Sequence, residues 1–181
     1  KKTNIDGLNA QYGNLPPQAI EVETAVLGAL MLEREAFETV SGIIDTGSFY
    51  KESHQKIFET IKSINSAKKP IDLLTVTQEL KDRNLLNEVG GPLEITQLTR
   101  KVASAAHIES HARILAEKYY LRETIQKANE LIKLAYSGED VEIISNEWKN
   151  SGESLDDVFT IADTGSHIKQ VLTTTLAELE K

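Results

Sequence analysis

Hydrophobic residues recur along this chain at intervals of three and four, the spacing that lines one face of an α-helix. Aromatic residues are few and there are only four prolines, so the pattern favours an all-α fold over a sheet protein. Toward the start of the chain it predicts helices at about 15–32, 35–44, 53–66 and 92–102, with another that begins after Asp72 as its N-cap. These helices should form a small globular head at 15–104.

The head should enclose one apolar core. We expect the first helix to turn Val26, Leu30 and Leu32 inward, with Gly28 allowing a close approach of its neighbours. The fifth helix should bury Leu93 and Leu98. The other inward positions predicted from the spacing are Val22, Ala25, Ala29, Phe37, Val40, Ile43, Ile44, Ile57, Phe58, Ile61, Ile64, Val76, Leu80 and Val102.

A much longer helical pattern runs from about 106 to 136 without Gly or Pro, which corresponds to a rod of about 45 Å. A short return helix at about 140–150 can cover only part of it, so 105–150 is predicted to be a projecting helical hairpin that dimerises. The alternative, in which the rod packs back on its own head, stays open. The stripe expected to face a second copy comprises Ile114, Leu121, Ile125, Ala128, Ile132 and Ala135.

Polar stretches lie at the start of the chain and after the hairpin. Residues 1–14 are predicted to be disordered, and 151–165, rich in Ser, Gly, Asp and Glu, to be an extended linker. Residues 166–181 are predicted to form an amphipathic helix that needs an apolar partner, either another chain or a domain beyond this sequence. Its apolar stripe is Ile168, Val171, Leu172, Leu176 and Leu179.

Charge and composition exclude several classes of protein. The net charge is −8, and only residues 100–136 carry a basic excess, with seven basic and four acidic groups. We therefore expect no phosphate-binding face, and interpret these cations as a solvated helix side interleaved with glutamates. No apolar run reaches the roughly 18 residues that span a bilayer, so a soluble, cytoplasmic protein without membrane contact is expected. The cations concerned are Arg113, Lys118, Arg122, Lys127 and Lys133.

The residues offer no catalytic, cofactor or metal site. The chain has no cysteine, no Gly-Lys-Thr or Gly-Lys-Ser phosphate loop and no Gly-x-Ser-x-Gly elbow. His107 and His111 are spaced for one helix face, but no third metal ligand accompanies them. Glu21 and Glu23 lie in a first helical turn, where the helix dipole favours carboxylates and a structural role is expected. We therefore expect no enzyme activity from this chain.

Several short motifs, in order, resemble the bacterial replicative DNA helicases of the DnaB family. The resemblance begins with the run at 15–30, Leu-Pro-Pro-Gln-Ala-Ile-Glu-Val-Glu-Thr-Ala-Val-Leu-Gly-Ala-Leu. It continues through Phe49-Tyr50, His54-Gln-Lys-Ile-Phe58, Pro70-Ile-Asp72, Val76-Thr77, Gly90-Gly91, Ala112-Arg-Ile-Leu115, Glu117-Lys118 and Leu121-Arg122.

The resemblance implies the N-terminal assembly and primase-docking domain of such a helicase, followed by its linker helix. In that family the hairpins pair subunits into a dimer, a trimer of dimers and a hexamer, and the linker helix docks on the motor domain of the neighbouring subunit. The N-terminal tier also binds the C-terminal domain of primase, and a helicase loader is a further expected partner. ATP, Mg and most DNA contacts belong to the motor domain that follows, so the whole helicase is an ATPase that unwinds DNA while this part is not.

By position, the resemblance assigns Glu21, Glu94, Ile125, Leu131 and Ile132 to a surface that faces primase or the dimer partner. The sequence departs from the family at Glu94-Ile95, where relatives commonly have Tyr-Leu, and at His111-Ala112, where they often have Tyr-Ala. An acidic residue at 94 implies a different or weaker contact with primase. The alternative function is a dimeric helical regulator whose head binds DNA, and the acidic net charge disfavours it.

Overall fold

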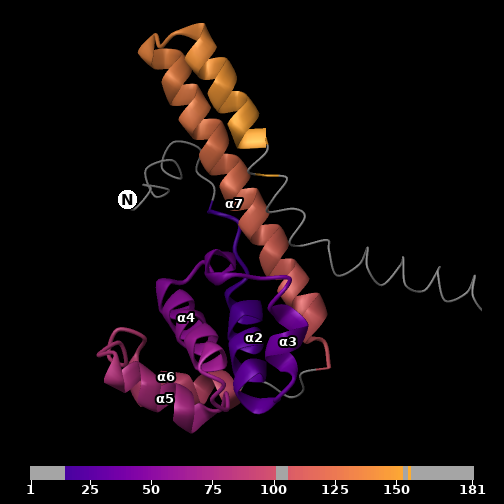
Figure 1. The fold of residues 1–181 in the computed structure, drawn as a ribbon, viewed down its shortest axis with the longest axis vertical. Helices are drawn as coiled ribbons and strands as arrows, with labels where there is room; N and C mark the ends of the chain where they lie inside the picture. Colours follow the sequence, from indigo (N-terminus) through magenta and orange to yellow (C-terminus); the bar gives the residue numbers. More distant parts are fainter. Residues whose placement is uncertain (1–14, 101–105, 153–154, 156–181) are drawn as a thin grey trace, which may run out of the picture.

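The computed structural model describes residues 15–100, 106–152 and 155. Within these residues the regular elements are helical and no strand occurs, which confirms the all-α prediction. Figure 1 shows a rounded head and a hairpin of two helices that extends from it. The elements are α2 (Ile20–Leu32), α3 (Ala36–Val40), the 3₁₀ helix η1 (Thr46–Ser48), α4 (Glu52–Ser66), α5 (Leu73–Asp82), α6 (Gly91–Arg100) and α7 (Ile108–Ser137), followed by a helical segment at 141–152.

Helix α2 is the centre of the head. It packs against α3, α4, α5, α6 and α7, and Val26, Leu27 and Leu30 are completely buried. A helix that is apolar on most of its sides can be stable only when it is surrounded in this way. Gly28 is buried, as the close packing predicted for it requires. The prediction for Leu32 is wrong: its side chain is 54% exposed, because it is the last residue of α2 and lies beyond the packed turns.

The second helix is shorter than predicted. Helix α3 ends at Val40, and the amides of Ile43 and Ile44 both donate to the Val40 carbonyl in a turn that continues past Gly42. The glycine ends the helix early because it loses more conformational freedom there than any other residue. The burial predicted for Phe37, Val40, Ile43 and Ile44 is nevertheless confirmed.

Helices α4, α5 and α6 close the other side of the core. The predicted cap of α5 is confirmed, since the amide of Thr75 donates to Asp72 Oδ1 at 2.8 Å. Gly90 and Gly91 have φ values of 99° and 77°, a left-handed backbone that glycine adopts without strain, and α6 begins there. Leu98 is buried, but the prediction for Leu93 is wrong: it is 67% exposed, because the first turn of α6 lies at the surface of the head. Val102 lies outside the described residues.

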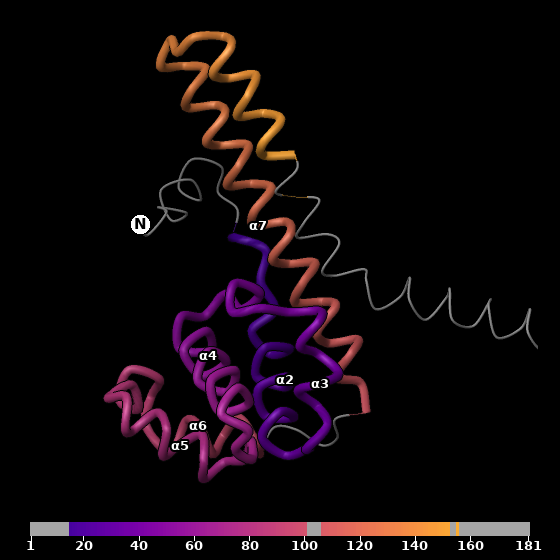
Figure 2. Tube along the Cα trace, viewed as in Figure 1, coloured from indigo at the N-terminus to yellow at the C-terminus, as the bar shows by residue number. Residues whose placement is uncertain are grey.

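Helix α7 joins the head to the hairpin. It is 30 residues long and ends at Gly138, whose φ of 75° is the left-handed conformation that commonly terminates helices. Its first part packs against α2, α3 and η1, whereas its second part continues beyond the head. Figure 2 shows the segment 141–152 running back along that second part. A projecting hairpin is therefore confirmed for the second part of α7 and the return segment, whereas the first part of α7 packs on the head, as the alternative had it.

Candidate interaction surface

Helix α7 has two apolar faces, and the head covers only one of them. On the covered face, Ile108, Ala112 and Leu115 are at most 6% exposed. On the other face, Ile114, Leu121, Ile125 and Ile132 are 36%, 37%, 40% and 43% exposed, and Ala128 and Ala135 are exposed as well. These six residues form one stripe, as their sequence spacing predicted. We call them the hairpin stripe.

The return segment covers only part of the second half of α7 and adds exposed apolar side chains of its own. Asn129 on α7 and Ser151 on the return segment are buried. Three large side chains of the hairpin are largely exposed: Tyr136 at 89%, Val141 at 80% and Trp148 at 70%. Ile143 is also half exposed. A hairpin that leaves this much apolar area uncovered is typical of an interaction surface.

The five residues assigned to a partner surface fall on two parts of the molecule. Ile125 and Ile132 lie in the hairpin stripe, and Leu131 is half-buried beside it. Glu21 is exposed in the first turn of α2, and Glu94 lies on α6, where its carboxylate accepts a hydrogen bond from Lys51 Nζ at 3.3 Å. In the described residues, no hydrogen bond or ion pair joins these two carboxylates to α7. The five residues therefore come from three helices, α2, α6 and α7.

The residues predicted to dock on a neighbouring motor domain cannot be placed. Ile168, Val171, Leu172, Leu176 and Leu179 lie outside the described residues, as does the segment 1–14 predicted to be disordered. The linker predicted at 151–165 is described only at 151, 152 and 155, and those residues are helical.

A buried carboxylate, for which the sequence analysis expected only a structural role in the first turn of its own helix, links α2 to α4. Glu23 is completely buried and accepts hydrogen bonds from the amide of Tyr50 at 2.7 Å and from that of Lys51 at 3.4 Å. It also lies 2.7 Å from His54 Nδ1, with both side chains 1% exposed. Glu23 therefore supplies acceptors at the start of α4, not only at the start of its own helix. The pair is enclosed by the core, where it serves structure rather than chemistry on a ligand.

The prediction for Arg122 is wrong. It was expected on a solvated helix face, but it is 8% exposed, and its guanidinium donates to the carbonyls of Pro17, Gly47 and Ser48. Burial lowers the pKa of the Arg122 guanidinium, while the negative charge of Glu23 opposes that shift. Sequence spacing gave no sign of this role, because the three carbonyls are backbone atoms of distant segments.

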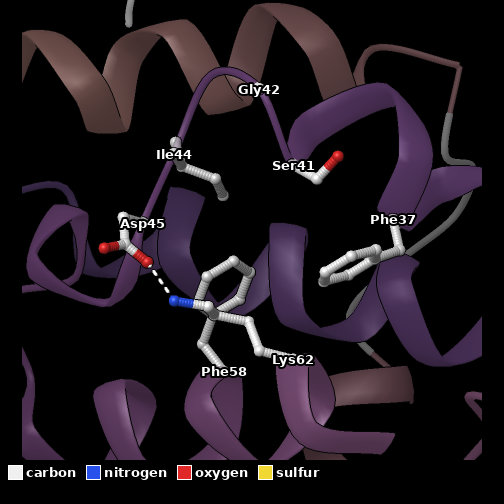
Figure 3. Close-up of a pocket in the computed structure, with 7 residues that line it drawn as sticks. All are labelled: Phe37, Ser41, Gly42, Ile44, Asp45, Phe58 and Lys62. Carbon is white, nitrogen blue, oxygen red and sulfur yellow. Dashed lines mark hydrogen bonds and ion pairs between the residues drawn. The ribbon is translucent and has the colours of Figure 1, made fainter. Parts of the chain in front are cut away.

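Figure 3 shows a hollow of about 490 Å³ on the head, between α3, the turn after it and α4. Phe37, Ile44 and Phe58 form its apolar floor. At its rim Lys62 Nζ donates to Asp45, and this hydrogen bond lowers the pKa of Asp45 and raises the pKa of Lys62. One ion pair above an apolar floor contains no nucleophile with an adjacent base, so the hollow does not have the arrangement of a catalytic site.

Neither a metal-binding cluster nor a membrane-spanning helix occurs among the described residues. No group of three or more His, Cys, Asp or Glu side chains in that part of the chain is arranged to hold a metal ion. None of its helices has the length and apolar content that crossing a membrane requires.

Comparison with known proteins gives one consistent family. The family model described as the DnaB-like helicase N terminal domain matches residues 15–117. The chain is 42% identical over 135 residues to the replicative DNA helicase DnaB of Rhodothermus marinus, and 42% identical over 126 residues to the replicative DNA helicase DnaC of Bacillus subtilis. These alignments cover 75% and 70% of the chain but only 14% and 28% of the two relatives.

Solved structures agree with the sequence comparison. The N-terminal domain of DnaB helicase from Mycobacterium tuberculosis superposes with a TM-score of 0.74 at 29% identity, covering 78% of this chain and 99% of that one. A structure described as that of a DnaB-like replicative helicase and its interactions with primase superposes with a TM-score of 0.65 at 20% identity, covering 75% of this chain and 31% of that one. This second likeness concerns the fold alone.

Proposed function

The chain belongs to the DnaB-like helicase N-terminal domain family, and from that premise we propose that it is the assembly and primase-docking domain of a replicative DNA helicase. The observation that carries the proposal is the hairpin stripe, an apolar face that the head leaves uncovered. A second copy that lays its own hairpin on this face would remove the stripe from water.

The energetics support self-association through the hairpin. Full burial of an aliphatic side chain contributes about 1.5 to 3 kcal/mol, and each large residue of the stripe keeps about two fifths of its surface for a partner. Trp148, Val141 and Tyr136 extend the same hairpin surface, and aromatic residues are enriched at the centres of protein interfaces. Pairing of hairpins would form a dimer, and three such dimers a hexameric tier.

The motor of the helicase would be supplied by residues outside this chain. The chain spans 14% and 28% of the two relatives named above, which are replicative DNA helicases. In the whole protein, a domain beyond these residues would bind ATP and Mg and make most of the contacts with DNA in the cytoplasm. The stripe of Ile168, Val171, Leu172, Leu176 and Leu179 would dock on that domain in the neighbouring subunit.

Primase is the proposed partner of the outer surface. Glu21 is exposed outside the hairpin stripe and is therefore available to another protein, whereas Ile125 and Ile132 would face primase only where a second copy does not cover them. Glu94 is engaged by Lys51, so a partner would compete for this carboxylate with the head itself. Leu131, half-buried beside the stripe, would contribute at its edge.

Sedimentation velocity over a range of protein concentration tests the assembly. The unmodified chain should form dimers or larger species at micromolar concentration, and Ile125→Asp should shift it to monomer, because an unpaired charge would be buried. Leu74→Asp is the matched control: this leucine is 80% exposed on α5 in the head, and its replacement should leave assembly unchanged. A chain that stays monomeric throughout, or equal behaviour of the two variants, would contradict the proposal.

Primase docking requires a separate measurement. Isothermal titration with the C-terminal domain of the cognate primase should detect binding that Glu21→Ala weakens without changing the sedimentation of the chain. Absence of heat with the unmodified chain would contradict the primase assignment and leave the assembly result intact.

A further inference from the structure

Arg122 lies where α7 leaves the head. On the head side of it, Ala112, Leu115 and Ala116 pack on the core with at most 3% exposure. Among the described residues of α7 beyond Arg122, only Asn129 is buried, and its amide donates to the Ile125 carbonyl of the same helix. The packed stripe on the head face of α7 therefore ends at Arg122.

Arg122 ties α7 to two separate segments of the head. One terminal nitrogen, Nη1, donates to the carbonyl of Pro17 at 2.9 Å, just before α2. The other, Nη2, donates to the carbonyls of Gly47 at 2.7 Å and Ser48 at 3.1 Å, in η1. A guanidinium presents its donors in a rigid planar fork, so it can satisfy carbonyls from both segments at once. An ammonium group would act as a single point charge and could not reproduce that geometry.

The surroundings of Arg122 are closely fitted. Its guanidinium carbon lies 5.8 Å from the ring centre of Tyr50 and 5.7 Å from that of Tyr119. The backbone of Gly47 approaches the Tyr119 ring so closely that a Cβ at this position would lie 2.9 Å from two ring carbons. A side chain at position 47 would therefore press on the end of the Tyr119 ring, which extends from α7 beside Arg122.

We propose that Arg122 is a positioning residue that sets the direction in which the hairpin leaves the head. The apolar contacts of α7 hold the helix against the core, but hydrophobic burial has no directional preference. The three hydrogen bonds of Arg122 are directional, and they reach two points of the head that a tilted helix could not contact together. The inference concerns one chain and does not depend on self-association or on primase.

Distance measurement between the two parts tests this positioning role. The chain has no cysteine, so Asn65→Cys on α4 and Lys133→Cys on α7, both at exposed positions, provide the two sites for spin labels. Double electron–electron resonance on labelled chains diluted with unlabelled chains then reports the distance within one molecule. With Arg122 in place, the distribution of distances between the two labels should be narrow. Arg122→Gln should broaden or displace that distribution.

Three further variants distinguish the hydrogen-bond geometry of Arg122 from its positive charge and from general effects of substitution. Arg122→Lys keeps the charge but not the fork, and should broaden the distribution as well. Gly47→Ala keeps Arg122 and should displace the distribution, because the new methyl group presses on Tyr119. Lys127→Gln is the matched control, since it removes a cation from the same helix one turn farther on, where its partner Glu130 is 3.9 Å away, and it should match the unmodified chain.

Circular dichroism on the same samples completes the test. The proposal is supported if Arg122→Gln keeps its helicity while its distribution of label distances broadens or shifts. A distribution that stays narrow and unshifted in Arg122→Gln and Gly47→Ala overturns it. Loss of the head's cooperative unfolding transition in Arg122→Gln and Arg122→Lys also overturns it, because Arg122 would then hold the head together rather than direct the hairpin.

Discussion

The head and the outer hairpin share one helical sequence pattern but differ in what surrounds it. In the head, Leu27 and Phe58 are at most 1% exposed, because five other helices pack around α2. On the hairpin, Ile132 and Trp148 are 43% and 70% exposed, because only one return segment accompanies the end of α7. The same periodicity thus forms a core in one region and an exposed apolar face in the other.

The difference also concerns polar groups. The head buries Glu23 with His54 and supplies each with a hydrogen-bonding partner, as buried polar groups require. The outer hairpin buries only the amide of Asn129 and the hydroxyl of Ser151 among its described polar side chains beyond Arg122. Stability should therefore be concentrated in the head. The loss of unfolding free energy caused by single substitutions in the two regions measures the difference.

Phe58→Ala should have the largest effect on the head. Its ring lies 4.9 Å from that of Phe49 and 6.3 Å from that of Phe37, and it is 1% exposed. Truncation leaves a cavity and should lower the free energy of unfolding by about 3 to 5 kcal/mol. Urea denaturation followed by circular dichroism measures this. A loss below about 1 kcal/mol would mean that the core relaxes into the space.

Glu23→Gln should have the next largest effect. The substitution keeps the size of the side chain but removes the charge that accepts from Tyr50 and faces His54. Hydrogen bonds to charged groups contribute about 1.5 to 3 kcal/mol, and a loss of that order is expected in the same urea assay. Glu21→Gln is the control, because Glu21 is exposed on the same turn of α2 and should change stability little. Equal losses of unfolding free energy in the two variants would contradict the stabilising link that Glu23 makes between α2 and α4.

Asp45→Asn should have a smaller effect that depends on pH. The hydrogen bond from Lys62 lowers the pKa of Asp45, so the folded state favours the carboxylate. Its contribution is present above the unfolded pKa, about 3.9, and is lost as the pH falls through the lower folded pKa. Because the pair is largely exposed, the difference from the unmodified chain should stay below about 1 kcal/mol at neutral pH and vanish in acid. A difference that grows on acidification would contradict this account.

Trp148→Ala should affect folding least of the four. In a packed core, loss of a tryptophan costs about 3 to 5 kcal/mol, but this ring is 70% exposed, so the dissociated chain should lose no more than about 0.5 kcal/mol. Urea denaturation at low protein concentration gives this value. Sedimentation at higher concentration should show weakened self-association. A large loss in the dissociated chain would show that Trp148 packs within its own hairpin, and the contrast with the head would fail.

The sequence predicted the elements well because helical periodicity is local. Helix α4, the cap at Asp72 and the extent of α7 all follow from spacing and from Gly, Pro and capping residues nearby. The errors at Leu32 and Leu93 have one cause: both residues lie in the terminal turn of a helix, where spacing gives the face but not whether a neighbour reaches it.

The candidate site was predictable only in part. The hairpin stripe follows from spacing, and its exposure was inferred correctly from the length of α7 relative to the return segment. The roles of Glu23 and Arg122 were not predictable in this way, because their partners are 27 to 105 residues away and include main-chain atoms that every residue has. The assignments of Glu21, Glu94, Ile125, Leu131 and Ile132 to a partner surface rest on family resemblance and stay predictions.

The uninterrupted length of α7 has a mechanical consequence. From Arg122 to Ser137 the helix contains no Gly or Pro and extends about 22 Å, so this stretch behaves as a stiff lever arm. A rotation of about ten degrees at its fulcrum would swing the tip by about 4 Å, given that length. A small rearrangement of side chains around Arg122 could leave the head intact and still move the tip by several ångströms. Such a movement would change which hairpin residues face a second chain.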